Sequence, residues 1–369
     1  MKTICACTAA LLTGTAAANT CRVYIGTMAK GDQAGIYMSL LDMQTGQLSE
    51  PVRVSPVNGA GFLAIHPDGQ HLYSASATTG LASAFMISKS GGMLTEINSQ
   101  STRGDGSCHV SIDPSGKNLL VANYRSGSCA VLPIQNNASL APASAFQQHS
   151  GSSVHPTRQT QAHTHSINCD PSGRFAIAAD LGIDKLMIYR FDADAGTLVP
   201  NDPPFTAIEP GGGPRHFTFH PNGKIAYADL ELSDKAVVFE YDQINGTLTE
   251  IQSISTLPDG YAGESIASEI RTTPDGRFLY AANRGHDSIA MFAIDADTGK
   301  LTSLGYEPVR GENPRNFNID PTGTYLIALN PNPGNAVVFR IDKKTGELEF
   351  TGSEISIPLP GCAQFLATP

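Results

Sequence analysis

The sequence predicts an all-β protein, a seven-bladed β-propeller with four antiparallel strands in each blade. Three observations support this prediction. A short Pro-x-Gly turn recurs six times along the 369 residues, with its prolines 47 to 57 residues apart. A second kind of turn, which ends in a leucine, occurs seven times. Short segments of alternating apolar residues lie between the turns, as in half-buried strands. Four strands in about 50 residues are typical of a propeller blade.

The fifth unit of the repeat shows the order of elements within a blade. Strands are predicted at 268–273, 278–283 and 288–295, and a fourth strand begins at Leu301. A Pro-Asp-Gly turn joins the first two strands, a loop at 284–287 joins the next two, and a Thr-Gly-Lys turn precedes the last. Turns that contain glycine between alternating strands indicate hairpins. Each blade is therefore expected to be an antiparallel meander.

The two ends of the chain explain why one turn occurs six times and the other seven times. Residues 361–367 resemble a lone first strand, and residues 21–48 supply strands two to four. Joined across the termini, they form a seventh blade, so the C-terminal strand closes the ring and both exposed edges are covered. The alternative is six blades with a loose terminal hairpin. Closure predicts a single domain over residues 19–369.

Residues 1–18 are predicted to be a signal peptide that directs the protein to the periplasm or outside the cell. The segment carries one basic residue, Lys2, an apolar stretch at 4–12 and small residues at 16–18. The alternative is an ordinary terminus on a cytoplasmic protein. Five cysteines follow the segment, and none forms a CxxC pair. Their places in the repeat predict free thiols: Cys21, Cys108, Cys129, Cys169 and Cys362.

Composition excludes several other classes of protein. Charged residues make up only 16% of the chain and the formal net charge is −10, which argues against coiled coils and nucleic-acid binding. After the first residues, no apolar run approaches the roughly 18 residues of a membrane span. The chain has no tryptophan, which excludes the Trp-Asp type of propeller repeat.

Polar side chains gather where the first strand of each blade begins and the second strand ends. Both places lie on one face of a propeller, around the mouth of the central channel, and functional residues usually lie on such loops. The residues six positions before the turn prolines are Gly61, Cys108, His165, Arg215, Ser268 and Arg315. Those five positions before are Phe62, His109, Ser166, His216, Glu269 and Asn316. The ends of the second strands add Asn123, Tyr124, Arg125, Asp180, Asp229, Glu231, Asn283, Arg284 and Asn330.

These positions favour a site for an anionic ligand or a developing oxyanion. Arg215, Arg284 and Arg315 come from three different blades, and guanidinium groups suit such charges. The alternative is that each arginine ties neighbouring blades through loop carbonyls. His163 and His165 alternate on one strand and should face opposite sides, which predicts acid–base chemistry at His165 rather than a metal pair. No metal or other cofactor is expected.

Two further features leave alternatives open. Glu231 lies in a Leu-Glu-Leu sequence, where it could belong to the mouth or be a solvated surface residue. The long segment at 141–161 carries His149, His155 and Arg158, and it could be a lid or only a mobile surface loop.

These residues resemble the lactonase family of seven-bladed propellers, which includes propeller-type 6-phosphogluconolactonases and the carboxy-muconate lactonising enzyme of fungi. The resemblance covers nearly the whole chain after residue 18. It is carried by His-Thr-His-Ser at 163–166, Asp-Leu-Gly-Ile-Asp-Lys at 180–185, Gly-Pro-Arg-His at 213–216, Glu-Leu at 231–232, Ser-Glu-Ile at 268–270, Pro-Asp-Gly-Arg at 274–277, Asn-Arg-Gly-His-Asp-Ser at 283–288 and Asn-Pro-Arg-Asn-Phe at 313–317.

The resemblance implies that four residues carry the chemistry: His165, Arg215, Glu231 and Arg284. We expect five others at the mouth to bind the substrate: His109, His163, His216, Glu269 and Arg315. The implied reaction is the hydrolysis of a lactone, such as a sugar lactone, with the arginines stabilising the oxyanion. The partner is then a small lactone or anionic sugar, phosphorylated or not, and a monomer is favoured. The alternatives are a secreted ligand-binding propeller without activity, a calcium-dependent sugar lactonase and a muconate-lactonising cyclase.

Overall fold

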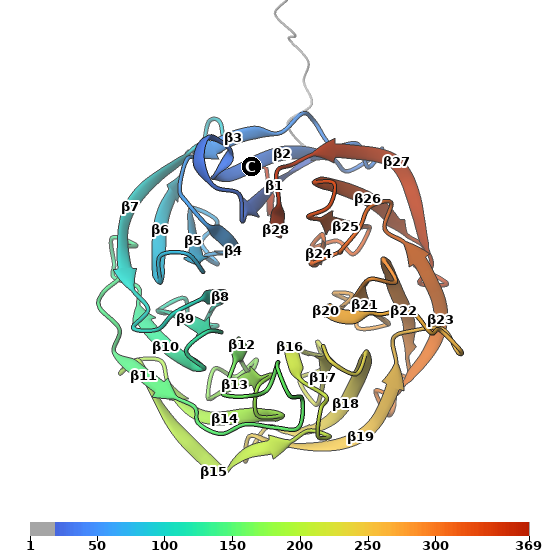
Figure 1. Cartoon of the computed structure of the whole chain (residues 1–369). Helices are drawn as coiled ribbons and strands as arrows, with labels where there is room; N and C mark the ends of the chain where they lie inside the picture. The colour runs from blue at the N-terminus through green and yellow to red at the C-terminus, as the bar shows by residue number, and fades with distance from the viewer. Residues whose placement is uncertain (1–18, 369) are drawn as a thin grey trace, which may run out of the picture.

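The strands of the computed structural model form seven four-stranded antiparallel sheets around a central channel (Figure 1). The structure describes residues 19–368, and the predicted signal peptide at 1–18 lies outside the described residues. The sheets match the predicted blades, so the all-β, seven-bladed fold is confirmed. Within the described residues, no helix is long and apolar enough to cross a membrane.

Each blade runs from an innermost to an outermost strand. The first three blades are β28 (Pro360–Ala367), β1 (Thr20–Thr27), β2 (Ile36–Asp42) and β3 (Val52–Ser55); β4 (Ala60–Ile65), β5 (His71–Ser76), β6 (Leu81–Ile87) and β7 (Leu94–Ser101); and β8 (Ser107–Ile112), β9 (Asn118–Asn123), β10 (Ser128–Pro133) and β11 (Ala145–Gln148). The next two are β12 (Thr164–Cys169), β13 (Phe175–Asp180), β14 (Lys185–Asp192) and β15 (Thr197–Ala207); and β16 (Pro214–Phe219), β17 (Ile225–Leu230), β18 (Lys235–Asp242) and β19 (Thr247–Ser255). The last two are β20 (Ile266–Thr272), β21 (Phe278–Arg284), β22 (Ser288–Ile294) and β23 (Leu301–Pro308); and β24 (Asn316–Ile319), β25 (Tyr325–Asn330), β26 (Asn335–Ile341) and β27 (Leu348–Ser356).

The C-terminal strand β28 closes the ring by pairing with β1, where the red and blue ends of the chain meet in Figure 1. This pairing confirms the predicted closure and excludes a loose terminal hairpin. Cys362 lies opposite Gly26 and Cys21 lies opposite Ala367, so the two thiols are at opposite ends of the hairpin. All five cysteines within the described residues are free, as predicted. The fourth strand of this blade begins at Val52, later than predicted, after the short 3-10 helix Gly31–Gln33 and strand β2.

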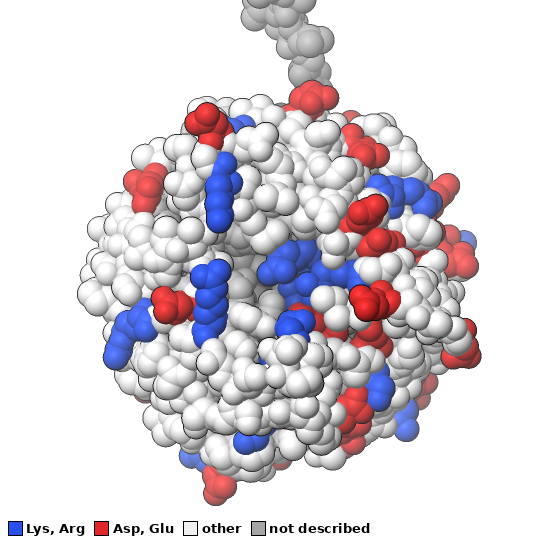
Figure 2. All heavy atoms as spheres, viewed as in Figure 1, with Lys and Arg blue, Asp and Glu red and all other residues white. Residues whose placement is uncertain are grey.

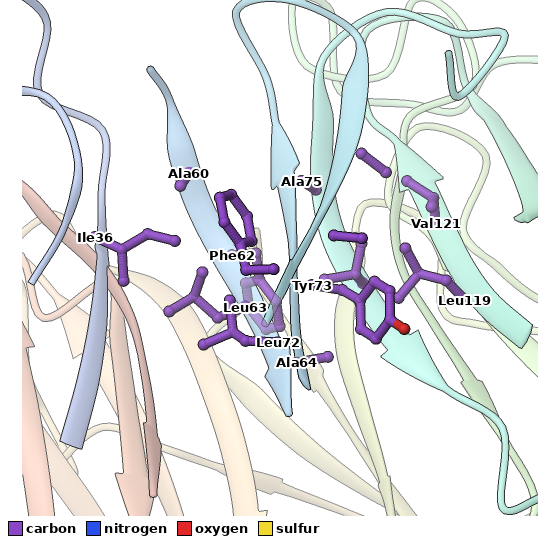
Figure 3. Packing of buried hydrophobic residues seen from close by; sticks show 14 of the residues in the cluster. Ile36, Ala60, Phe62, Leu63, Ala64, Leu72, Tyr73, Ala75, Leu119 and Val121 are labelled. Atoms are coloured by element: carbon purple, nitrogen blue, oxygen red, sulfur yellow. The ribbon is translucent and has the colours of Figure 1, made fainter. Parts of the chain in front are cut away.

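Apolar side chains fill the space between neighbouring blades and hold the ring together. Ile36 from β2, Leu72 from β5 and Leu119 from β9 belong to one buried cluster that crosses three blades (Figure 3). Buried tyrosines add polar ties, since the Tyr73 hydroxyl donates a hydrogen bond to the Ala138 carbonyl in the next blade. Tyr24, Tyr227 and Tyr280 make the same kind of contact, to Gly92, Gly299 and Gly346. Apolar packing and these hydrogen bonds together join neighbouring blades around the channel.

A β-bulge near the start of each innermost strand positions the site. A bulge adds one residue to a strand and changes the direction of its side chain. At Cys108, for example, Ser107 pairs with Asn123 and His109 pairs with Ala122, so Cys108 is the extra residue. In the last blade, Arg315 lies just before β24. Its backbone N–H donates to the carbonyl of Leu329, and Asn316 also pairs with Leu329. Two residues thus face one partner, as at the other bulges. The residues at the seven bulges are Gly61, Cys108, His165, Arg215, Ser268, Arg315 and Gly361.

Candidate active site

Six of the seven bulge residues line one narrow cavity of about 120 Å³ at the mouth of the channel. They are Gly61, Cys108, His165, Arg215, Arg315 and Gly361, and Phe62 and His216 lie beside them. A wider cavity of about 280 Å³ shares Cys108, His165 and Arg315 with the first and is also lined by Tyr124, Arg125, Arg158, Glu231 and Arg284. Figure 2 shows basic side chains gathered in this central hollow, although the protein as a whole is acidic.

Glu231 is the centre of a cluster of arginines. Its Oε2 lies 2.9 Å from Arg215 Nε and 2.9 Å from Arg284 Nη2, and its Oε1 accepts a hydrogen bond from Arg158. Burial would raise the pKa of Glu231, but the charges of Arg284, Arg215 and Arg158 outweigh it and lower the pKa to about 2. The Glu231 side chain is only 3% exposed, so it is not the solvated surface residue of the alternative interpretation.

The arginines carry more positive charge than Glu231 can balance. Arg315 has no ion pair or side-chain hydrogen bond among the described residues, so it does not tie blades through loop carbonyls. Burial and the charges of Arg215 and Arg284 lower its pKa to about 10. Arg284 does donate to a carbonyl, that of Ala267, 2.9 Å away in the same blade. Arg215 Nη1 is buried and finds no acceptor among the residues described. The mouth thus has unused donors for an anion.

His165 lies beside these arginines with a neutral imidazole. Burial, followed by the charges of Arg215, His216 and Arg315, holds the pKa of His165 well below its usual 6.5. Its Nδ1 lies 4.0 Å from the Cys108 sulfur, and burial raises the pKa of that thiol to about 11. Cys108 is therefore a thiol rather than a thiolate at neutral pH, and the imidazole is the group there that can accept a proton.

Two of the residues that follow the bulges, His109 and Glu269, line neither mouth cavity. The His109 ring packs at a tilt against Phe62, with ring centroids 4.4 Å apart, and His109 lines a separate cavity deeper in the channel. Glu269 lines none of these cavities and is bonded to His216, Ile270, Arg271 and Asn316. The sequence placed these two predicted substrate-binding residues at the mouth. The bulges turn the residues that follow them away from the wider cavity: His109 and Glu269 lie outside both mouth cavities, whereas Phe62 and His216 still line the narrow one.

His163 and His165 lie in different places, but strand alternation is not the reason, because residues two apart in a regular strand face the same side. His163 precedes β12, and His165 is the extra residue of the bulge in that strand, so only His165 lines the mouth cavities. His163 stacks on Tyr124, with ring centroids 4.5 Å apart, and its Nδ1 lies 2.9 Å from the Tyr124 carbonyl oxygen. The ring of His165 contacts the same tyrosine edge-on, 5.4 Å between centroids. His163 lines neither mouth cavity and supports Tyr124, which does.

The chain between β11 and β12 supplies a site residue that was not among the predicted site residues. Arg158 reaches across to Glu231 and to the Tyr124 hydroxyl, which it approaches to 3.2 Å. The segment is anchored rather than loose, since Ser153 and Gln159 both bond to Asp184. His149 also anchors it, through Asp180 at 2.6 Å and Tyr189 at 2.6 Å. This long connection lies outside the strand repeat, so the spacing of the turns does not predict where its side chains lie. Only the charge of Arg158 could have indicated a role in the site.

Most polar residues at the ends of the second strands hold backbone groups. Asp180 accepts the His163 N–H, Asp229 accepts the His216 N–H, and Asn283 donates to the Thr256 carbonyl. Asn123 and Asn330 do the same for Thr102 and Val309. Burial raises the pKa of Asp229 to about 7. These residues shape the mouth, whereas Tyr124, Arg125, Glu231 and Arg284 line it.

Comparison with known proteins shows relatives along nearly the whole chain. A 6-phosphogluconolactonase of Bacillus subtilis is 39% identical over 345 residues, 93% of this chain and 97% of its own. A 6-phosphogluconolactonase of Formosa agariphila is 34% identical over 310 residues, 81% of this chain and 86% of its own. The solved structure of a periplasmic gluconolactonase from Pseudomonas aeruginosa superposes with a TM-score of 0.89 at 32% identity, over 95% of this chain and 100% of that one.

A family model described as "Lactonase, 7-bladed beta-propeller" matches residues 22–365. This range begins in β1 and ends in β28, so it includes every blade and the strand that closes the ring. The match confirms the resemblance seen in the sequence. The protein is thus a member of the lactonase family of seven-bladed β-propellers.

Proposed function

We propose that the protein is a lactone hydrolase that opens a sugar lactone at the mouth of its channel, with His165, Arg215, Glu231 and Arg284 carrying the reaction. One observation carries this proposal. A buried carboxylate pairs with Arg215, which lines the narrow cavity, and with Arg284, which lines the wider one, and the neutral His165 lines both. The names of the similar proteins, 6-phosphogluconolactonase and gluconolactonase, support the same reaction.

The arginines are suited to the charge that develops in this reaction. When water attacks a lactone carbonyl, the negative charge gathers on the carbonyl oxygen, and fixed donors stabilise it most where water is excluded. Arg215 is 1% exposed and Arg284 is largely buried, and both are held by Glu231 before any substrate enters. Their orientation therefore requires no rearrangement during the reaction. Arg315, which has no carboxylate partner among the residues described, is free to bind an anionic group of the substrate.

Glu231 and His165 have different parts in this proposal. A carboxylate with a pKa of about 2 that is ion-paired with three arginines remains ionised and accepts a proton from water only weakly. The geometry favours Glu231 as the residue that holds the arginines. His165 is neutral and can hydrogen-bond to the ring oxygen of the lactone, which leaves as an alkoxide when the ring opens. A further group must then accept the proton of the attacking water.

The other candidate functions make different demands on the mouth. A calcium site requires several carboxylates and carbonyls as ligands. Glu231 is the only carboxylate among the described residues that line the two mouth cavities. Its oxygens are already ion-paired with arginines, so they are poor ligands for a calcium ion. A muconate-lactonising cyclase would use the same arginines on a dicarboxylate, and a binding protein would use them without turnover. A substrate panel distinguishes these functions.

The experiment is a hydrolysis assay with three compounds. Acid release from glucono-δ-lactone, 6-phosphoglucono-δ-lactone and a muconolactone is followed at constant pH against the spontaneous rate, and cyclisation of the corresponding muconate is followed in parallel. We expect saturable acceleration of a sugar lactone and no cyclisation. Binding without acceleration would support the non-catalytic alternative, and cyclisation alone would support the cyclase.

We also propose that residues 1–18 direct export. The support is the arrangement of Lys2, an apolar stretch and three alanines, together with the periplasmic location that is named for the similar gluconolactonase of Pseudomonas aeruginosa. Sequencing the N-terminus of the mature protein from its native host is the test. We expect a start close to residue 19, and a mature chain that begins at Met1 would contradict export by this segment.

A further inference from the structure

The second histidine of the narrow cavity, His216, is paired with a buried carboxylate. His216 Nδ1 lies 2.9 Å from Glu269 Oε1, and both side chains are buried. Burial would raise the pKa of Glu269, but Arg271 and His216 outweigh it and lower it to about 2. Because this carboxylate is ionised, it accepts the hydrogen bond, so Nδ1 carries the proton and Nε2 carries the lone pair. A carboxylate that fixes the tautomer of a histidine is the arrangement that activates bases in hydrolases.

The other nitrogen of this ring is unused. His216 Nε2 is buried and has no hydrogen-bond partner among the described residues, although the ring lines the narrow cavity. A buried acceptor without a donor destabilises the fold, so such groups are rare in native proteins and call for an explanation. Burial lowers the pKa of His216 to about 4 against the opposing effect of Glu269, so the ring is neutral. A bound water or substrate hydroxyl would supply the missing donor.

A second histidine–carboxylate pair in the same protein shows the contrast. His149 Nδ1 lies 2.6 Å from Asp180, but its Nε2 is bonded to the Tyr189 hydroxyl at 2.6 Å. Both nitrogens are used, and the pair lines neither mouth cavity. That pair anchors the segment that follows β11, whereas the pair in the channel leaves one nitrogen open beside Arg215 and His165.

We infer that His216 is the general base of lactone opening and that Glu269 is its positioning residue, an inference that rests on the proposed lactone hydrolysis. His216 Nε2 takes a proton from the attacking water as the water oxygen bonds to the carbonyl carbon. The bond between that carbon and the ring oxygen then breaks. The leaving alkoxide takes up the proton from Nε2, so the dyad ends the cycle as it began and the product is a hydroxy acid. His165, whose ring centroid lies 5.2 Å from that of His216, is placed to hydrogen-bond to the same ring oxygen.

The test compares kcat and KM for wild type, His216→Gln, Glu269→Gln and Glu269→Asp on the lactone that wild type opens. General-base catalysis typically contributes about 10²–10⁴-fold. We expect His216→Gln and Glu269→Gln to lose kcat on this scale with little change in KM, and Glu269→Asp to recover part of it. Circular dichroism and thermal unfolding identify any variant that fails to fold. If His216→Gln does not fold, the Glu269→Gln and Glu269→Asp pair still gives the comparison.

The matched control is His220→Gln. His220 lies four residues further along the same blade, and its Nε2 lies 2.8 Å from the Gly276 carbonyl oxygen, away from the mouth cavities. It should keep wild-type kcat. Folded dyad variants with wild-type kcat would overturn the inference and leave lactone hydrolysis standing. A wild-type protein that opens no lactone would overturn the proposed function, and the inference with it.

Discussion

Arg315 differs from Arg158, Arg215 and Arg284 because no carboxylate balances its charge among the described residues. The other three form ion pairs with Glu231, whereas Arg315 lines both cavities with its guanidinium free. Desolvation and the charges of Arg215 and Arg284 disfavour its charged form and lower its pKa to about 10. Arg315 is half-buried and its charge is unpaired, so we propose that an anionic ligand completes the site.

Replacing Arg315 by Gln is therefore expected to weaken substrate binding without weakening the fold. A hydrogen bond to a charged group contributes about 1.5–3 kcal/mol, which corresponds to a KM about ten- to a hundredfold higher. The thermal midpoint should stay or rise, because repulsion with Arg215 and Arg284 is removed. Arg277→Gln, an exposed arginine paired with Asp275, is the control. A KM equal to that of wild type would show that Arg315 does not contact the substrate.

Among the elements, strands of neighbouring blades approach one another so closely near the mouth that side chains are excluded at some positions. Gly26 in β1 is one of these. A Cβ on Gly26 would lie 2.1 Å from the Ala60 carbonyl oxygen in β4 of the next blade. That contact is with backbone, so relief requires β1 or β4 to move, and the mouth is built on the start of β4.

Gly26→Ala is expected to destabilise the protein by about 1–3 kcal/mol, the usual effect of overpacking a tight interior. Chemical unfolding monitored by circular dichroism measures it. Gly91→Ala is the matched control, since Gly91 is exposed and a Cβ there meets nothing within 4 Å. Equal stability of the two variants would mean that β1 and β4 do not pack as closely as described.

For the whole molecule, a periodic sequence made the fold and much of the site predictable. The spacing of the turns determines the number of blades. His165, Arg215 and Arg315 each lie six positions before a turn proline, and the repeat therefore brings them to one mouth. Single-residue features were harder to predict. The bulges depend on strand pairing, so the sequence did not reveal that His109 and Glu269 lie below the cavity. Arg158 comes from a connection outside the repeat, and its contact with Glu231 depends on the packing of that connection.

A ring of blades holds arginines around one glutamate, and we propose that these arginines stabilise the oxyanion of lactone opening. The most direct test is kcat for lactone opening by Arg284→Gln, whose side chain keeps a donor but loses the charge beside Glu231. Losing such a donor typically lowers kcat by about 10²–10³-fold, and we predict this loss in a folded variant. A folded Arg284→Gln protein with wild-type kcat would contradict the claim.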